Sequence, residues 1–242
     1  TTKKGIGPCY ADKIQRSGIR IQDLLDDEVF AQKVKTNVEE KNQLLTKVYG
    51  RNPMDPNEII NEFKTYKEII NNHIQDTSLM ISNAIKEGKN ILFEGAQGTL
   101  LDIDHGTYPF VTSSNTSSAN AAIGSGVGPL NLNKIVGVTK AYISRVGSGP
   151  FITEQENDIG DYLIEKGAEF GVVTGRRRRC GWLDLISLKY SVRVNSLTEL
   201  FITKLDVLSG LEEIKLGVGY RNGDEVITDY PYQQNVFYNA EP

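Results

Sequence analysis

The chain has 242 residues, which is enough for one large domain or two small ones, and 39% of them are hydrophobic. No apolar stretch approaches the roughly 18 residues of a membrane-spanning helix, so we expect no membrane partner. The formal net charge of -4 argues against bulk binding of nucleic acid, which normally requires a strongly basic domain. Any basic site must therefore be local.

The cysteine content and the chain ends give two further expectations. Cys9 and Cys180 are too few for a disulfide framework or a zinc site, and no signal-peptide pattern precedes them, which makes the cytoplasm the default compartment. Residues 1–5 lack an initiator Met and resemble the middle of a glycine loop, and residues 239–242 bring no closing element. We expect an internal fragment of a longer protein.

A helical subregion is predicted at about residues 20–88. Apolar side chains in residues 26–49 recur with helical spacing between charged residues, which predicts an amphipathic helix. Asp55-Pro56 combines a candidate N-cap with a proline suited to the first helical turn, and the same apolar period continues from there to Gly88. The two long helices are expected to form a helical hairpin.

The rest of the chain alternates predicted strands with predicted helices. Short apolar runs predict buried strands at 90–94, 135–142, 199–203 and 214–220, and helices are predicted at 158–166 and 183–194. Asn222-Gly223 is a hairpin signal. The alternation predicts an α/β fold with a mainly parallel central sheet, surrounding helices and the helical hairpin as an insertion. We expect residues 1–242 to be part of a single domain of this kind.

Polar loops follow the predicted strand 90–94. Residues 95–99 (GAQGT) are rich in glycine, and small hydroxyl and amide residues continue to Thr116. Ligands of open α/β sheets bind beyond the carboxyl ends of strands, where Gln and Thr side chains suit a neutral polar ring and phosphate oxygens. The alternative is a loop stabilised by its own Asx and Ser/Thr turns. For His105 we expect a structural hydrogen bond rather than catalysis.

Four consecutive arginines, Arg176 to Arg179, follow the glycine-bounded loop 171–175. Because arginine stays protonated and offers planar forks of donors, the cluster requires carboxylates or an anionic ligand in its space. The loop can add backbone N–H groups and the Thr174 hydroxyl to the same anion. The alternatives are a solvated basic stretch and a nucleic-acid patch.

Lys204 and Asp206 directly follow the predicted strand 199–203. A carboxylate at the end of a strand can accept from both the ring N–H and the exocyclic amine of guanine, a pairing that adenine cannot make. The lysine stem can lie over the base. A lone Lys-x-Asp also arises often by chance, which is the alternative to a guanine site.

Five motifs in order resemble the adenylosuccinate synthetase family from Thr1 to about Tyr220. They are residues 5–10 (GIGPCY) with Lys13 and Arg16, 93–99 (FEGAQGT), 105–109 (HGTYP), 174–176 (TGR) with 178–182 (RRCGW), and 203–208 (TKLDVL). The resemblance implies a P-loop NTPase-like synthetase architecture. It also implies an enzyme that uses GTP and Mg²⁺ to join IMP and L-aspartate into adenylosuccinate, through a 6-phosphoryl-IMP intermediate on the route to AMP.

The resemblance further implies which residues bind each substrate. For IMP these are Thr2, Arg16, Gln97, Thr112, Val146 and Arg176, with Arg16 reaching the phosphate from the neighbouring subunit of a homodimer. For aspartate they are Val172, Val173, Thr174, Gly175, Arg176, Arg177 and Arg178. For GTP they are Arg178, Lys204, Leu205 and Asp206. Lys13 and Gln97 are the implied catalytic residues.

Two positions depart from the family pattern. Val173 stands where Thr is common, so one hydroxyl contact to aspartate is expected to be missing, and Ile152 stands where Pro is common. The family carries its phosphate loop, with a catalytic Asp and His, before the position of Thr1. The Mg²⁺ ligands are therefore expected mainly outside the fragment, which itself is expected to be inactive. The competing hypothesis is a non-catalytic module that binds a guanine nucleotide or nucleic acid with Arg176 to Arg179.

Overall fold

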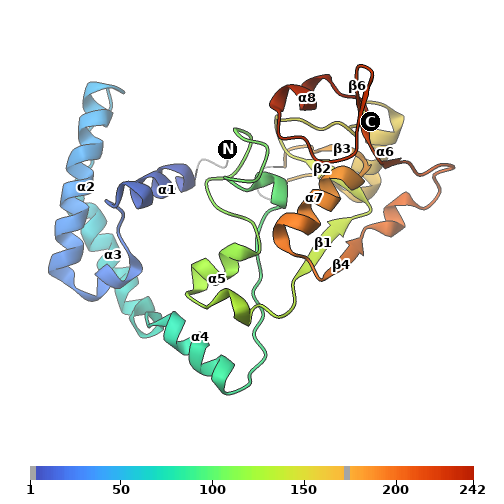
Figure 1. The fold of residues 1–242 in the computed structure, drawn as a ribbon. Helices are drawn as coiled ribbons and strands as arrows, with labels where there is room; N and C mark the ends of the chain where they lie inside the picture. The colour runs from blue at the N-terminus through green and yellow to red at the C-terminus, as the bar shows by residue number, and fades with distance from the viewer. Residues whose placement is uncertain (1–3, 172–174) are drawn as a thin grey trace. The chain divides into compact units, whose positions relative to one another are not determined.

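A computed structural model describes residues 4–171 and 175–242 (Figure 1). The chain divides into two compact units, of which one extends to Asn90 and the other begins at Ile91. Each unit has its own cluster of buried apolar side chains. The unit boundary falls close to the expected end of the helical subregion, and the single-domain expectation stays a prediction.

The first unit is built from helices. They are α1 (Ile6–Gln15), η1 (Ile21–Leu25), α2 (Asp27–Lys47), α3 (Pro56–Ile70), η2 (Asn71–His73) and α4 (Thr77–Lys86), where η marks a short 3-10 turn. Phe30, Val34 and Val38 on α2 pack with Ile60 on α3 and with Leu24, and Figure 1 shows α2 and α3 side by side. This confirms the predicted helical hairpin.

Carboxylates set where these helices begin. The Asp26 side chain accepts from the N–H groups of Glu28 and Val29 at the start of α2. The Asp55 side chain accepts from the Asn57 N–H at the start of α3, with Pro56 in the first turn, which confirms the predicted helix start.

The prediction of one continuous helix from Pro56 to Gly88 is wrong. The helix ends at Ile70, and a second helix, α4, begins at Thr77. Asp76 caps α4 by accepting from the Leu79 N–H at 3.0 Å. A carboxylate that bonds backbone N–H groups ahead of it competes with helix continuation, and apolar spacing alone does not register this competition.

The second unit combines strands with helices. Its strands are β1 (Val136–Lys140), β2 (Tyr142–Arg145), β3 (Arg179–Asp184), β4 (Glu199–Thr203), β5 (Leu216–Gly217), β6 (Tyr220–Asn222) and β7 (Glu225–Ile227). Its helices are α5 (Ala119–Ser125), α6 (Asp158–Gly167), α7 (Leu185–Asn195) and α8 (Gln234–Asn239), with 3-10 turns η3 (Thr99–Leu101), η4 (Pro129–Asn131) and η5 (Leu205–Leu208). The predicted α/β class is confirmed.

The strands pair in three groups. β1 pairs with β4 in parallel, β3 lies between antiparallel β2 and parallel β5, and β6 and β7 form an antiparallel hairpin. The hairpin confirms the Asn222-Gly223 signal, because Gly223 takes the left-handed conformation with φ 63°. Helix α6 packs on β3 and η5 through Leu163, Ile164, Cys180 and Val207.

Several predicted strand boundaries and burials are wrong. Residues 90–94 form no strand, and Leu92 is 88% exposed, because an extended segment becomes a strand only when a neighbour bonds its backbone. The predicted strand 135–142 is two strands in different sheets, with Ala141 between them. The predicted strand 214–220 is shortened to β5 and the first residue of β6.

The predicted burial of the β1–β4 pair is also wrong within the described part of the chain, because Val138 is 72% and Phe201 63% exposed.

The predicted helix 183–194 begins two residues later, since Leu183 and Asp184 end β3. The Asp184 carboxylate caps α7 by accepting from the N–H groups of Ile186 and Ser187. Strand β3 is not predicted from the sequence, because it begins within the arginine run and too few apolar residues follow to form a recognisable strand pattern.

Candidate functional site

The polar loop that follows Gly98 is organised by one buried carboxylate, Asp102. The side chain is fully buried and accepts backbone N–H bonds from Asp104, His105, Thr116 and Ser117 at 2.6–3.1 Å. Two segments of the loop therefore converge on one carboxylate, with 104–105 donating to the Oδ1 and 116–117 to the Oδ2. A buried acid of this kind needs several donors to offset its desolvation.

Burial by itself raises the pKa of the Asp102 carboxyl, but the backbone N–H bonds outweigh it and hold the pKa below its usual range. The carboxyl is thus charged at neutral pH. The Asn115 amide adds a further donor at 3.2 Å. The alternative of a loop stabilised by its own Asx-type hydrogen bonds is therefore correct for residues 102–117, and it is compatible with a binding site presented by the same loop.

Two residues implied for IMP lie together on this loop. The Gln97 Nε2 donates to the Thr112 Oγ1 at 3.2 Å, although the two residues are 15 positions apart. Gln97 is in the left-handed conformation with φ 68°, which is uncommon for a residue other than glycine and is a frequent feature of functional loops. Thr112 is fixed by its backbone N–H, which donates to the Leu101 carbonyl at 2.9 Å.

The histidine of the loop contributes through its backbone. The His105 N–H donates to Asp102, and the His105 carbonyl accepts from the Tyr190 hydroxyl at 2.7 Å. These bonds tie the loop to α7. The structural hydrogen bonding expected of His105 is thus made by its main chain.

Residues 171–178, called the arginine loop below, are closed at their base by backbone contacts. Phe170 bridges to Arg177, the Gly171 N–H donates to the Arg176 carbonyl at 2.8 Å, and the Gly175 N–H donates to the Gly171 carbonyl at 2.7 Å. Gly175 has φ 62°, a conformation that favours glycine. The implied aspartate residues Val172, Val173 and Thr174 lie outside the described residues.

Arg177, Arg178 and Arg179 each have a carboxylate partner in the same unit. Arg177 pairs with Asp161, the Arg178 Nη1 donates to the Glu169 Oε2 at 2.8 Å, and the Arg179 Nε donates to the Glu154 Oε1 at 2.7 Å. The expectation that carboxylates share the space of the cluster is confirmed. A wholly solvated basic stretch does not fit these pairs.

Arg176 lies beside the backbone next to Val146, which is also implied for IMP. A Cβ built on Gly147 would be 3.9 Å from the Arg176 Nη1, so the guanidinium group is next to the backbone that follows Val146. Val146 is itself 48% exposed. The Arg176 guanidinium group thus lies next to the residue that follows Val146 in the chain.

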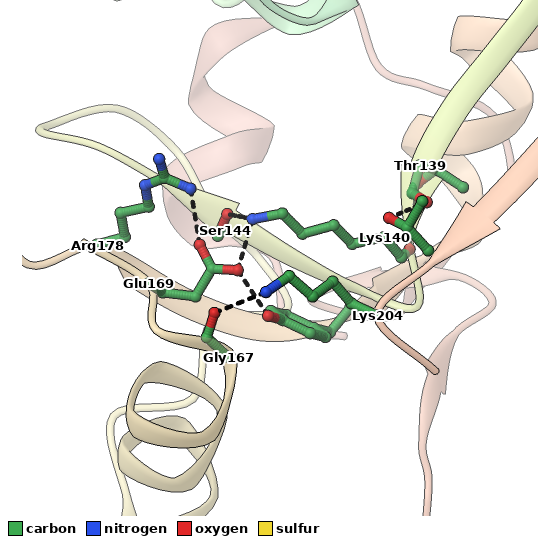
Figure 2. Close-up of polar contacts among 9 residues, drawn as sticks. Thr139, Lys140, Ser144, Gly167, Glu169, Arg178 and Lys204 are labelled. Carbon is green, nitrogen blue, oxygen red and sulfur yellow. Dashed lines mark hydrogen bonds and ion pairs between the residues drawn. The ribbon is translucent and has the colours of Figure 1, made fainter. Parts of the chain in front are cut away.

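Four charged residues, Lys140, Glu169, Arg178 and Lys204, are drawn in Figure 2. Glu169 is the most buried of them. The carboxylate accepts from the Lys140 Nζ at 2.6 Å, from the Tyr142 hydroxyl at 2.6 Å and from Arg178. Burial raises the pKa of the Glu169 carboxyl, but these hydrogen bonds and the Lys140 charge outweigh it and hold the pKa below its usual range.

The implied guanine residues follow the carboxyl end of β4. Lys204 is in the left-handed conformation with φ 62°, and its Nζ donates to the Gly167 carbonyl at 2.9 Å. Leu205 and Asp206 begin the turn η5, and Leu205 is 61% exposed. The placement directly after a strand, which the sequence predicted, is confirmed.

The implied residues of the first unit lie on and after α1. Lys13 is in the last turn of α1, with its Nζ 5.6 Å from the Tyr10 ring centroid. Arg16 caps the helix in the left-handed conformation with φ 66°. Both side chains are exposed within this unit, whereas Thr2 lies outside the described residues.

Sequence reasoning missed the residues that hold the site together. Besides Asp102 and Glu169, Arg145 donates to the Thr107 Oγ1 and the Phe110 carbonyl at 2.9 and 3.0 Å and to the carbonyls of Ser148 and Pro150. Burial, followed by the charge of Arg179, lowers the pKa of Arg145. The sequence signal that could have indicated such residues is a charged side chain inside or beside an apolar run, as Lys140 is just before β2 and Arg145 is at its end.

Within residues 4–171 and 175–242 no group of three or more His, Cys, Asp or Glu side chains is arranged to hold a metal ion. In the same residues, no helix combines the length and the apolar character that crossing a bilayer requires.

Replacing Asp102 by Asn should lower the free energy of unfolding by about 2–3 kcal/mol at pH 7, because an amide NH₂ would face backbone donors. The folded-state pKa of Asp102 is lowered, so its stabilisation is present above the unfolded value of about 3.9 and is lost as the pH falls through the folded value. The difference in free energy of unfolding between parent and variant, measured by urea denaturation, should therefore become smaller at acidic pH.

Asp104→Asn is the matched control for this prediction. The Asp104 carboxylate is exposed and accepts from the Asn115 amide at 2.6 Å, a bond that an Asn oxygen can also accept. Its replacement should change stability by no more than about 0.5 kcal/mol. Equal losses in the two variants would contradict the organising position of Asp102.

The chain matches the family model described as adenylosuccinate synthetase over residues 1–242. Among curated proteins, the adenylosuccinate synthetase of Halothermothrix orenii is 55% identical over 100% of this chain and 56% of its own length. The adenylosuccinate synthetase of Heliobacterium modesticaldum is also 55% identical, over 100% of this chain and 57% of its own length. The chain thus spans somewhat more than half the length of these relatives.

The solved structure of fully ligated adenylosuccinate synthetase from Plasmodium falciparum is similar over the whole chain. It is 42% identical, with a TM-score of 0.92, over 100% of this chain and 57% of that chain. This likeness confirms the α/β synthetase fold. Together with the family model that matches every residue, it shows that the chain belongs to the adenylosuccinate synthetase family.

Proposed function

We propose that this chain is part of an enzyme that joins IMP and L-aspartate to form adenylosuccinate, with conversion of GTP to GDP and phosphate. The observation that carries the proposal is the match of the whole chain, in sequence and in fold, to this family. The Gln97–Thr112 contact supports it, because both residues are assigned to IMP by the resemblance, and so does the position of Arg176 beside Gly147, which follows the implied IMP residue Val146.

The reaction proceeds in two displacements. The γ-phosphoryl group of GTP moves to the 6-oxygen of IMP with release of GDP, and the amine of aspartate then attacks carbon 6 of the purine and expels phosphate together with that oxygen. Gln97 lies against the purine near the 6-oxygen, and Thr112 binds the phosphate of IMP, as Thr2 does. Lys13 is the second catalytic residue, and its cationic group stabilises charge on the phosphoryl oxygens.

The arginine loop binds aspartate in this proposal. Residues 172–178 supply backbone N–H groups and guanidinium forks for the two carboxylates, and Arg178 also reaches the GTP phosphates. Arg176 contributes to the ribose site beside Val146. Support comes from the closed base of the loop and from the carboxylates that hold Arg177 and Arg178.

Lys204, Leu205 and Asp206 bind guanine. The Asp206 carboxylate accepts from the two adjacent donors of the base, and the Lys204 stem and Leu205 pack on it. Support comes from their position beyond the carboxyl end of β4 and from the exposure of Leu205.

The reaction class also implies Mg²⁺, which when bound neutralises charge on phosphate oxygens. The described residues do not by themselves fit such a site, because no suitable group of three ligands occurs among them. We propose that the Mg²⁺ ligands lie mainly outside this chain and that the chain alone is therefore inactive.

We also propose that the enzyme is a cytoplasmic homodimer. In this dimer, Arg16 of one subunit reaches the IMP phosphate that is bound by the other.

A non-catalytic module for nucleic acid is less well supported. Arg177, Arg178 and Arg179 each bond a carboxylate, which neutralises much of the charge that a phosphate backbone would require. The family match also favours the enzyme.

Asp206→Asn should raise the KM for GTP by about 10-fold or more, because a bidentate pair contributes about 1–3 kcal/mol. The KM for IMP should stay near the parent value. The variant is measured by steady-state kinetics in a protein that carries this chain at the length of its relatives. Glu213→Gln removes an exposed carboxylate from the segment that follows and should change neither constant. An unchanged GTP KM in Asp206→Asn would show that guanine is bound elsewhere.

Arg16→Leu should be complemented by a second protein inactivated at Arg176. Hybrid dimers contain one site with both arginines intact, so mixing two inactive proteins should restore part of the activity, up to about a quarter of the parent's for random pairing. Mass spectrometry of the mixture verifies that hybrids form. Hybrids without recovered activity would place Arg16 in its own subunit's site or in a purely structural position.

A further inference from the structure

The C-terminal turn of α6 joins two parts of the proposed site. Helix α6 ends at Gly167, Ala168 follows in the left-handed conformation with φ 52°, and the Glu169 N–H donates back to the Ile164 carbonyl at 2.9 Å. These backbone bonds fix residues 167–169 relative to the helix. The same three residues hold Arg178 on one side and Lys204 on the other (Figure 2).

Arg178 is held by Glu169 through two separate contacts. The Arg178 N–H donates to the Glu169 carbonyl at 2.9 Å, and the Arg178 Nη1 donates to the Glu169 Oε2 at 2.8 Å. Main chain and side chain are thus both fixed, at the point where the arginine loop returns to β3. Among the described residues, the buried Nε of Arg178 has no hydrogen-bond partner, so Glu169 uses only part of the donor capacity of this guanidinium.

Glu169 is in turn held by two side chains from the neighbouring strands. Lys140 and Tyr142, from β1 and β2, both donate to the Glu169 Oε1, and the Lys140 Nζ also donates to the Ser144 hydroxyl at 2.6 Å. This leaves the Glu169 Oε2 for Arg178. The division between the two oxygens makes the carboxylate a rigid connection between the strands and the arginine loop.

The same turn supports the guanine motif. The Lys204 Nζ donates to the Gly167 carbonyl, which is two residues from Glu169. Gly167 itself is packed on Tyr142, because an added Cβ would lie 2.2 Å from the Tyr142 hydroxyl. Any displacement of this turn would therefore move Lys204 and Arg178 together.

We propose that Glu169 is a positioning residue, which orients Arg178 to bind the aspartate carboxylate and keeps the arginine loop in register with the guanine motif through residues 167–169. Glu169 touches no substrate and acts through Arg178. The inference rests on the proposed function, because it concerns the aspartate and GTP subsites of that reaction.

The test is steady-state kinetics of Glu169→Gln in a protein that carries this chain at the length of its relatives. The KM for aspartate should rise by about 10-fold and the KM for GTP by a few-fold, whereas the KM for IMP should stay within about 2-fold of the parent value. A residue needed only for folding would lower the amount of active enzyme, and hence the apparent kcat, without this difference between substrates.

Glu154→Gln is the matched control. Glu154 forms the same kind of pair with the neighbouring Arg179, whose other donors bond the Gly147 and Gly149 carbonyls. Its replacement should leave the KM for aspartate within about 2-fold of the parent value. In an Arg178→Ala background, Glu169→Gln should add less than about 2-fold, because a residue that acts through Arg178 has no further effect once Arg178 is removed.

If Glu169→Gln cannot be purified, Tyr142→Phe tests whether Glu169 positions Arg178. It removes one donor to Glu169 and keeps the carboxylate, so the KM for aspartate should rise by about 3-fold. If the KM for aspartate is unchanged in Glu169→Gln, or in Tyr142→Phe when that variant replaces it, the inference about Glu169 is wrong and the proposed function is unaffected. A parent that neither makes adenylosuccinate nor binds aspartate in calorimetry overturns the proposed function and the inference together.

Discussion

The bond between Glu169 and Arg178 is the interaction on which the arginine loop depends. Four adjacent cations cannot share one loop unless negative charge offsets their repulsion. Removing Arg178 would take away one of the donors that offset the buried Glu169 charge, which is destabilising. The 2% exposed Glu169 side chain therefore constrains both the local fold and the direction of the guanidinium group.

Buried carboxylates organise the second unit in a common way. Asp102 gathers two segments of the polar loop through backbone N–H groups, Asp184 caps α7 and accepts from the Tyr220 hydroxyl, and Glu169 joins β1 and β2 to the arginine loop. Each acid replaces lost hydration by several donors at fixed positions. Among the proposed substrate residues, Thr112 lies within the polar loop that Asp102 organises and Arg178 bonds Glu169 directly, so these two residues are held in fixed positions.

The sequence predicted those features that depend on local chemistry. Asp55-Pro56 marked a helix start, Asn222-Gly223 marked a hairpin, and Lys204 to Asp206 lay at the end of a strand as expected. The carboxylate partners required by the arginine run were also found. These predictions succeed because the residues concerned act on their immediate neighbours.

Features set by distant contacts could not be predicted in the same way. Residues 90–94 have the composition of a strand but no bonded neighbour, and β1 and β4 have apolar side chains that remain exposed within the described chain. Nothing near Glu169 in the sequence indicates that Lys140, 29 positions away, is its partner. Pairing and burial of this kind depend on which segments meet in space.

GTP-dependent formation of adenylosuccinate tests the central claim most directly. A purified protein that carries this chain at the length of its relatives is supplied with IMP, aspartate, GTP and Mg²⁺, and product is measured with each component omitted in turn. The account predicts product only when all are present, and none from residues 1–242 alone. Absence of product from the longer protein, or product formed without GTP, would contradict it.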